Sequence, residues 1–270
     1  MTSHYCFGKV GVDGISGRIH VPLAVSCKLR CGYCSYSNNG NILCDSLPGA
    51  SNLSLSTHED ISNWLQDKVK KNPDVRIIGV AGPGDPLLNP IQLEMFFEII
   101  NQHYCDYTVC LCSSGLNFKE IEPLLIGQKT LKYITFTINS INPKTINKIY
   151  FPSKMQFNAE LFIEEQNYAV NRCIENNIKV KVNSVYLPTI NDDEIYHLYD
   201  FYSKLGVNIF NLIPYQRNNG HLFAKLPPIN YVKYKDLIAK LEFAGIDVLQ
   251  KCYKCRADEC GIFKNNGDCK

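Results

Sequence analysis

The stretch RIHVPLAVSCKLRCGYC, residues 18–34, joins an apolar run to three closely spaced cysteines. Residues 18–25 predict a buried β-strand. Cys27, Cys31 and Cys34 follow it directly with the spacing C-x3-C-x2-C. Thiols are thereby brought to the carboxyl end of a strand, where they could form disulfides or bind a metal.

The composition argues against disulfides. The chain has 270 residues, of which 45% are hydrophobic and 20% charged, so it can form one large domain with its own core. Disulfide frameworks stabilise small domains in oxidising compartments, and an odd total of 13 cysteines would leave one thiol over. Metal ligation by thiolates is the better explanation. Cys105 and Cys173, by contrast, are predicted to be small buried hydrophobic side chains.

The sequence predicts a cytoplasmic protein with no nucleic acid and no membrane among its partners. The first residues lack an apolar signal core, and no run of about 18 apolar residues occurs. The formal net charge of +2 provides neither a basic surface for nucleic acid nor an acidic tail.

Strand and helix patterns alternate along the chain. A capping box from Ser56 to Glu59 predicts the start of a helix. The apolar face of this helix consists of Ile61, Trp64, Leu65 and Val69. Further strands are predicted at 75–81, 107–112, 133–138, 179–187 and 207–214, and further helices at 91–103, 117–126, 158–177, 191–206 and 230–243.

About six strand–helix units in series predict an α/β fold with parallel strands. The count is short of a closed barrel, so a partial (β/α)6 barrel of TIM type fits, with a doubly wound sheet as the alternative. We expect residues 1–250 to form this core domain. Residues 251–270 are predicted to form an irregular, cysteine-rich C-terminal tail of the same domain. In both folds, functional residues gather at the carboxyl ends of the strands.

Three cysteines on one loop suit an iron–sulfur cluster with one open iron. A cubane [4Fe–4S] cluster takes one cysteine for each iron, so three thiolates leave one iron to bind a substrate. Zinc is the alternative, although zinc sites usually pair C-x2-C motifs. The spacing resembles that of the radical S-adenosylmethionine (SAM) superfamily. This resemblance implies that the open iron binds the methionine end of SAM, and that Tyr33 lies against the adenine.

The other strand ends provide candidates for binding SAM. In GVAGPGDPLLNP, residues 79–90, Gly82 and Gly84 allow close approach of the backbone, and Asp85 could accept hydrogen bonds from a ligand ammonium group. The alternative is that Asp85 caps the next helix. Asn139 and Asn183 could bind the ribose or the carboxylate, or close turns. The remaining candidates at these strand ends are Thr137 and Val185.

Longer stretches narrow the resemblance to the NifB family of nitrogenase cofactor maturation enzymes. They are GRIHVPLAVSCKLRCGYC, IIGVAGPGDPLLNP, ITFTINSINPKTINKIY, KVNSVYLPTIND and KCYKCRADECG. The likeness extends from about residue 4 to 263, in the short form without a NifX-like domain. It implies that two auxiliary [4Fe–4S] clusters are fused, with a SAM-derived carbide and an added sulfur, into an [8Fe–9S–C] precursor of the nitrogenase cofactor.

The resemblance also implies ligands for the auxiliary clusters. Cys252, Cys255 and Cys110 fall on the ligands of one cluster. Cys6 and His20 fall near the ligands of the other, with Cys44 as its third. Two alternatives remain open: His20 could be a core histidine, and Cys44 an ordinary loop thiol.

The chain departs from the family pattern around one auxiliary site. Residues 14–16 read Gly-Ile-Ser where the family has a histidine pair, and an acidic residue is replaced around residues 46–47. The spacing from Cys34 to Cys44 is longer than in the family, and Cys260 and Cys269 have no counterpart. These changes put the ligands and proton-handling groups of that site in question more than the SAM chemistry.

Two other functions remain open. One is a radical SAM maturase that modifies peptides and carries auxiliary clusters, and the other is an iron–sulfur carrier. A carrier has no need of the GPGDP turn. For the NifB-like function we expect as partners an iron–sulfur cluster donor, cofactor acceptor proteins of nitrogenase assembly and an electron donor such as ferredoxin.

Overall fold

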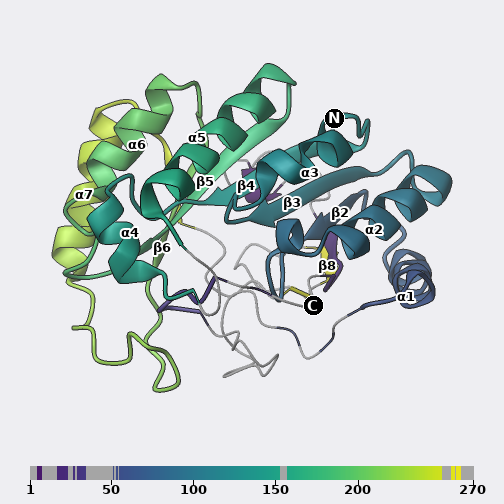
Figure 1. The fold of residues 1–270 in the computed structure, drawn as a ribbon, viewed down its shortest axis with the longest axis horizontal. Coiled ribbons are helices and arrows are strands. Elements are labelled where there is room, and N and C mark those ends of the chain that lie inside the picture. The colour runs from purple at the N-terminus through teal and green to yellow at the C-terminus, as the bar shows by residue number, and fades with distance from the viewer. Residues whose placement is uncertain are drawn as a thin grey trace.

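The computed structural model describes residues 5–7, 17–23, 27, 29–34, 51, 53, 55–152, 157–250, 257–258 and 260–262. Within these residues a sheet of eight strands carries helices along its outer side (Figure 1). The strands are β1 (Gly17–His20), β2 (Ile77–Val80), β3 (Thr108–Ser113), β4 (Leu131–Thr137), β5 (Lys179–Tyr186), β6 (Phe210–Pro214), β7 (Val248–Leu249) and β8 (Cys260–Ile262). The helices are α1 (His58–Lys71), α2 (Pro90–His103), α3 (Phe118–Ile126), α4 (Pro143–Ile149), α5 (Ala159–Glu175), α6 (Ile195–Lys204) and α7 (Tyr231–Phe243), with 3-10 helices η1 (Tyr5–Phe7) and η2 (Pro86–Leu88).

The order of the strands decides between the two predicted architectures. Strands β1 to β7 are parallel neighbours in chain order, and Figure 1 shows the helices following the sheet from α1 at one end to α7 at the other. A doubly wound sheet reverses its strand order at a switch point, and the described strands show no such reversal. The predicted α/β fold of the partial-barrel type is therefore confirmed.

The tail contributes a strand that the sequence pattern did not indicate. Strand β8 pairs antiparallel with β1, so that Ile19 lies opposite Cys260. A side chain at Gly17 would lie 2.6 Å from the carbonyl oxygen of Gly261, so glycine is needed for this close approach. The prediction that 251–270 is irregular was therefore wrong at β8, because two glycines and not an apolar period permit the pairing.

Side chains alternate between the two faces of the sheet. The residues of β3, β4 and β5 that line the inner cavity are Cys110, Cys112, Ser113, Thr135, Thr137, Lys181, Asn183 and Val185, and Leu111 also reaches it. Between them, the residues in the core shared with the helices are Val109, Leu111, Ile134, Phe136, Val180 and Val182. The two-residue period of a strand thus separates an apolar outer face from a polar inner face.

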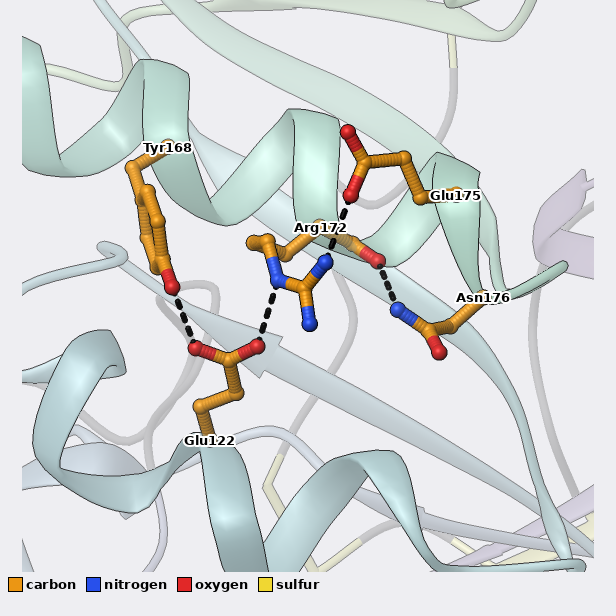
Figure 2. Close-up of polar contacts among 5 residues, drawn as sticks. All are labelled: Glu122, Tyr168, Arg172, Glu175 and Asn176. Carbon is orange, nitrogen blue, oxygen red and sulfur yellow. Dashed lines mark hydrogen bonds and ion pairs between the residues drawn. The ribbon is translucent and has the colours of Figure 1, made fainter.

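Polar contacts outside the sheet hold α3 against α5. Glu122 of α3 accepts hydrogen bonds from the Tyr168 hydroxyl (2.6 Å) and from Arg172 Nε (2.5 Å), and Arg172 also pairs with Glu175 (Figure 2). The bonds from Tyr168 and Arg172 lower the pKa of Glu122. Gln166, on the same helix α5, donates to backbone carbonyls at the ends of β3 and β4. Helix α5 therefore contacts both α3, through these polar side chains, and the ends of β3 and β4, through Gln166.

None of the described helices is both long and apolar enough to cross a membrane.

The first turn of α1 is capped one residue later than predicted. Thr57 Oγ1 accepts a hydrogen bond from the Asp60 amide (3.1 Å), and the Asp60 carboxylate accepts one from the Thr57 amide (3.3 Å). The predicted box from Ser56 to Glu59 was wrong, because both pairs have the same spacing and the sequence cannot rank them. The predicted apolar face does pack on the core.

We expect Thr57→Ala to lower the free energy of unfolding by about 1 kcal/mol, because it removes the cap acceptor. Ser56→Ala is the matched control and should change it by less than about 0.5 kcal/mol. Urea denaturation measures both. A larger effect at Ser56 than at Thr57 would contradict the observed cap.

Candidate active site

A cavity of about 270 Å³ lies on the inner face of the sheet, toward the carboxyl ends of the strands. The predicted site residues that line it are Cys6, His20, Cys27, Cys31, Tyr33, Cys34, Gly84, Asp85, Cys110, Thr137, Asn183 and Val185. Gly82 and Asn139 are not part of the lining. Cys44, Cys252 and Cys255 fall outside the described residues. One space therefore collects residues from η1, the cysteine loop and several strands.

Backbone contacts from distant segments fix the cysteine loop. The Gly32 amide donates to the Ile149 carbonyl (2.9 Å), and the Phe223 amide donates to the Gly32 carbonyl (3.0 Å). Cys31 also forms an isolated β-bridge with Tyr150. A side chain at Gly32 would lie 2.4 Å from the end of the Phe223 ring, so any larger residue would displace this ring. The loop is thus held over the cavity from both sides.

The three loop thiols, Cys27, Cys31 and Cys34, form what we call the loop group. The sulfurs of Cys27 and Cys31 both approach the Leu29 carbonyl, at 3.4 and 3.9 Å. Burial raises the pKa of Cys27, and Asp85 and Cys34 raise it further. Burial and the other two loop thiols likewise raise the pKa of Cys31. Cations among these sulfurs would therefore stabilise all three thiolates together.

The donor set of the loop group suits a cubane with one open iron. A cubane takes a separate cysteine for each iron, so three thiolates leave one iron without a protein ligand. Among the described residues, no three His, Cys, Asp or Glu side chains form a group that could hold one metal ion. No disulfide forms among the described cysteines.

Cys6, His20 and Cys110 form a second set of donors, which we call the inner group. His20, Gly79 and Cys110 lie at one level across β1, β2 and β3. A methyl group at Gly79 would lie 2.7 Å from His20 Cδ2 and 2.8 Å from the Cys110 sulfur, so the two donors are neighbours. The Cys6 thiol accepts a hydrogen bond from Arg18 Nη1 (2.9 Å). The structure thus brings together residues that the sequence had assigned to separate clusters.

Two buried cations accompany the inner group, and the sequence reasoning missed both. Arg18 is 3% exposed and contacts the Cys6 thiol, while Lys181 is 2% exposed and donates to the Cys6 carbonyl (3.0 Å). The Lys181 ammonium also lies 4.9 Å from the centre of the Phe7 ring. The signal for Lys181 was the alternation in KVKVN, which places it on the same face as Asn183. Buried cations beside thiols favour thiolate ligands and an anionic occupant of the cavity.

Asp85 joins two turns at the edge of the cavity. Its carboxylate accepts hydrogen bonds from the Leu87 amide (3.1 Å), from the Ser113 hydroxyl (2.7 Å), and from the amide (2.8 Å) and hydroxyl (2.5 Å) of Ser114. Burial raises the pKa of Asp85, and the serine bonds act in the opposite direction. The bond from the Leu87 amide shows that Asp85 caps the helix that follows it, which is the alternative role that the sequence left open. A SAM ammonium group would have to share or displace one of them.

The two predicted asparagines differ in their surroundings. Asn139 is fully buried, donates to the hydroxyls of Tyr33 (2.9 Å) and Tyr150 (3.0 Å), and accepts from the Val185 amide (2.8 Å). Asn139 therefore links the end of β4 to β5 and orients the Tyr33 ring through its hydroxyl. Asn183 lines the cavity, and its buried Oδ1 finds no hydrogen-bond partner among the described residues. A buried acceptor left without a partner costs about 1–3 kcal/mol, so Asn183 suits contact with a ligand.

Three further cysteines, Cys105, Cys112 and Cys173, differ in their exposure. Cys173 on α5 is fully buried in the core, as predicted. Cys105 is exposed, so the prediction of a buried side chain was wrong there; it follows α2, in the turn before β3. Cys112 lines the cavity and was not among the predicted site residues.

The sequence of the chain was compared with models of known protein families. The family model described as the Radical SAM superfamily matches residues 21–202, about two thirds of the chain. The chain belongs to the radical SAM superfamily. Membership implies a [4Fe–4S] cluster and SAM as cofactors. The loop group lies within the matched residues of this radical SAM chain.

Curated relatives carry the name FeMo cofactor biosynthesis protein NifB. This radical SAM chain is 29% identical to the one from Chlorobaculum tepidum over 271 residues, which cover 96% of the chain and 62% of the relative. It is 29% identical to the one from Methanocaldococcus jannaschii over 273 residues, covering 97% of the chain and 86% of the relative. The Azotobacter vinelandii protein is 26% identical, with 98% of the chain and 54% of the relative covered. The chain is thus NifB-like over nearly its whole length, and it spans between about half and most of each relative.

Solved structures share the fold. Streptococcus suis SuiB superposes with a TM-score of 0.61 at 14% identity, covering 86% of this chain and 48% of SuiB. Coproporphyrinogen III oxidase (HemN) from Escherichia coli, a radical SAM enzyme, gives a TM-score of 0.54 at 14% identity, covering 84% of this chain and 52% of HemN. At such identities the likeness shows the fold alone.

We expect Asp85→Asn to lower the free energy of unfolding by about 1–3 kcal/mol, because an amide nitrogen replaces one acceptor oxygen. SAM affinity should also fall, by about tenfold or more, since both turns at the cavity edge shift, while the iron content stays constant. Urea denaturation and equilibrium dialysis measure the two effects.

Asp106→Asn is the matched control, because Asp106 is exposed and should affect neither quantity. Lower stability with an unchanged SAM dissociation constant would restrict Asp85 to capping. Unchanged stability would contradict the observed bonding.

Proposed function

We propose that this chain is a radical SAM enzyme of FeMo cofactor biosynthesis. It would fuse two [4Fe–4S] clusters, a carbon from a SAM methyl group and an added sulfur into an [8Fe–9S–C] precursor. The observation that carries the proposal is that the loop group and the inner group line the same cavity. The likeness to NifB over 96% or more of the chain supports this choice of reaction.

The loop group and the strand ends would bind the cofactors. Cys27, Cys31 and Cys34 would hold the cluster, and the cluster would supply the electron for cleavage of the carbon–sulfur bond of SAM. Tyr33 offers a ring for the adenine, held in place through its hydroxyl. Asn183 offers its Oδ1 to a ligand donor such as a ribose hydroxyl. These residues bind and orient SAM at one side of the cavity.

The inner group would hold a cluster as substrate. Imidazole binds iron less tightly than thiolate, so a ligand set that includes His20 can surrender its cluster more readily than an all-cysteine set. Arg18 and Lys181 would balance the negative charge of a thiolate-bound cluster. Cys252 and Cys255 are proposed as ligands of the second substrate cluster. Cys44 is proposed as a further ligand of an auxiliary cluster.

The reaction would need partners and a reducing compartment. We propose an iron–sulfur cluster donor, an acceptor protein of nitrogenase assembly and an electron donor such as ferredoxin, in the cytoplasm. An iron–sulfur carrier would bind clusters without cleaving SAM, and a peptide-modifying maturase would cleave SAM without placing its methyl carbon in a cluster. These two readouts separate the alternatives from the proposal.

We expect the reduced, reconstituted protein to convert SAM to 5′-deoxyadenosine and Cys31→Ala to abolish the conversion. The two remaining loop thiolates cannot hold the cubane in place. Cys105→Ala is the matched control, since Cys105 is exposed and should leave the rate unchanged. Chromatography of 5′-deoxyadenosine measures the rate of the conversion. Undiminished cleavage by Cys31→Ala would refute the radical SAM assignment of the loop.

We expect the double substitution Cys252→Ser and Cys255→Ser to remove about four irons per chain while SAM cleavage survives. The transfer of isotope-labelled methyl carbon into an iron–sulfur product should disappear, because one cluster substrate is no longer held. Iron analysis and label counting measure both effects. If labelled carbon still entered a cluster, the tail cysteines would have no part in fusion.

A further inference from the structure

Strand β3 presents two cysteines to the cavity. Cys110 and Cys112 both line it, whereas Leu111 between them is buried in the core and only borders the cavity. Inward residues two apart on a strand stand about 7 Å from one another along it. Two thiols at that separation are too far apart to share one ion easily, but they can each bind a different iron of one cluster.

The surroundings of Cys112 connect it to the inner group. Cys112 lies level with Thr135, which in turn lies level with Lys181. Lys181, Asp85 and, more weakly, Cys6 act electrostatically on Cys112. Cys6 acts also on Cys110, so the Cys6 thiol lies near both cysteines of β3. Three thiols and the His20 imidazole therefore border one part of the cavity.

Cys112 does not have the environment of a packing residue. Cys173, which does, is fully buried among the helix and strand side chains of the core. Cys112 is partly exposed, and it faces the cavity beside a buried ammonium group. Cys112 also forms a side-chain hydrogen bond with Thr137, which a serine could make equally well. A thiol at this place therefore suggests a function that requires sulfur.

We propose that Cys112 is a ligand of an auxiliary [4Fe–4S] cluster, completing with Cys6, Cys110 and His20 a set of one donor for each iron. The proposal rests on the proposed function, because this cluster would be one of the two substrates. Each cysteine releases its thiol proton to solvent as its sulfur binds iron. Cys110 then belongs with the inner group instead of with the tail cysteines.

The test isolates this site within the full-length chain. A background variant carries alanine in place of Cys27, Cys31, Cys34, Cys252 and Cys255, and is reconstituted anaerobically with sulfide and equal amounts of ferrous and ferric iron, the oxidation states that the cluster contains. It should retain about four irons per chain. Alkylation followed by mass spectrometry should show Cys112 reacting about tenfold or more slowly after reconstitution, while exposed Cys105 reacts at an unchanged rate. Absence of iron, or an unchanged rate at Cys112 with Cys6 and Cys110 protected, would overturn the proposal.

A second variant guards against indirect protection. Cys112→Ser in the same background keeps the size and the hydrogen bond to Thr137. It should lose iron to a chelator about tenfold faster and change the electron paramagnetic resonance spectrum of the reduced cluster. Cys105→Ser should change neither property. Identical iron release and an identical spectrum for Cys112→Ser would exclude ligation. SAM cleavage by the unsubstituted chain tests the proposed function separately. Cleavage by that chain together with a failure of the Cys112 tests would overturn the ligand assignment alone, whereas loss of cleavage would overturn the proposed function.

Discussion

The alternation of side chains along the parallel strands places thiols, an ammonium group and amides on the inner face of the sheet and aliphatic side chains on the outer face. Burial of the apolar outer face against the helices drives folding, so the inner face does not need to bury apolar side chains. The inner face can then keep polar residues such as Cys110, Lys181 and Asn183, which a packed barrel core would exclude. An open barrel whose inner face carries thiol, amide and ammonium groups is therefore a consequence of where the aliphatic residues of the strands lie.

The cysteine loop depends on a different constraint, because it has no apolar period of its own. Its position is fixed by backbone bonds to Ile149 and Phe223, far along the chain, and by the absence of a side chain at Gly32. Asp85 performs a similar task at the neighbouring turns through its bonds to Ser113 and Ser114. The strands supply one set of donors and the loop another, and these long-range contacts hold both at one cavity.

Much of this could be predicted from the sequence, for physical reasons. Strand and helix periods are local, so six of the parallel strands and most helices were predicted close to their observed limits. The short helix α4 and strands β7 and β8 were not, because they have too few residues to show a period. The spacing of the three cysteines is local too, and it indicated the cluster loop directly.

What could not be predicted depends on neighbours that are distant in sequence. Asn139 and Asn183 look alike in the sequence, but only the fold shows that one amide is fully bonded and that the other leaves an acceptor in the cavity. The choice between Thr57 and Ser56 as the cap rests on backbone angles. Cys112 and Lys181 had a local signal, since each alternates with core residues, but their proximity to Cys6 is tertiary.

The central claim is that one cavity holds the cluster that binds SAM and, beside the inner group, a cluster substrate. The most direct measurement is anomalous diffraction at the iron edge from crystals of the anaerobically reconstituted protein. The account predicts one iron peak at Cys27, Cys31 and Cys34, and a second at Cys6 and Cys110 within the same cavity. Iron at the loop cysteines without any iron peak at the inner group would contradict it.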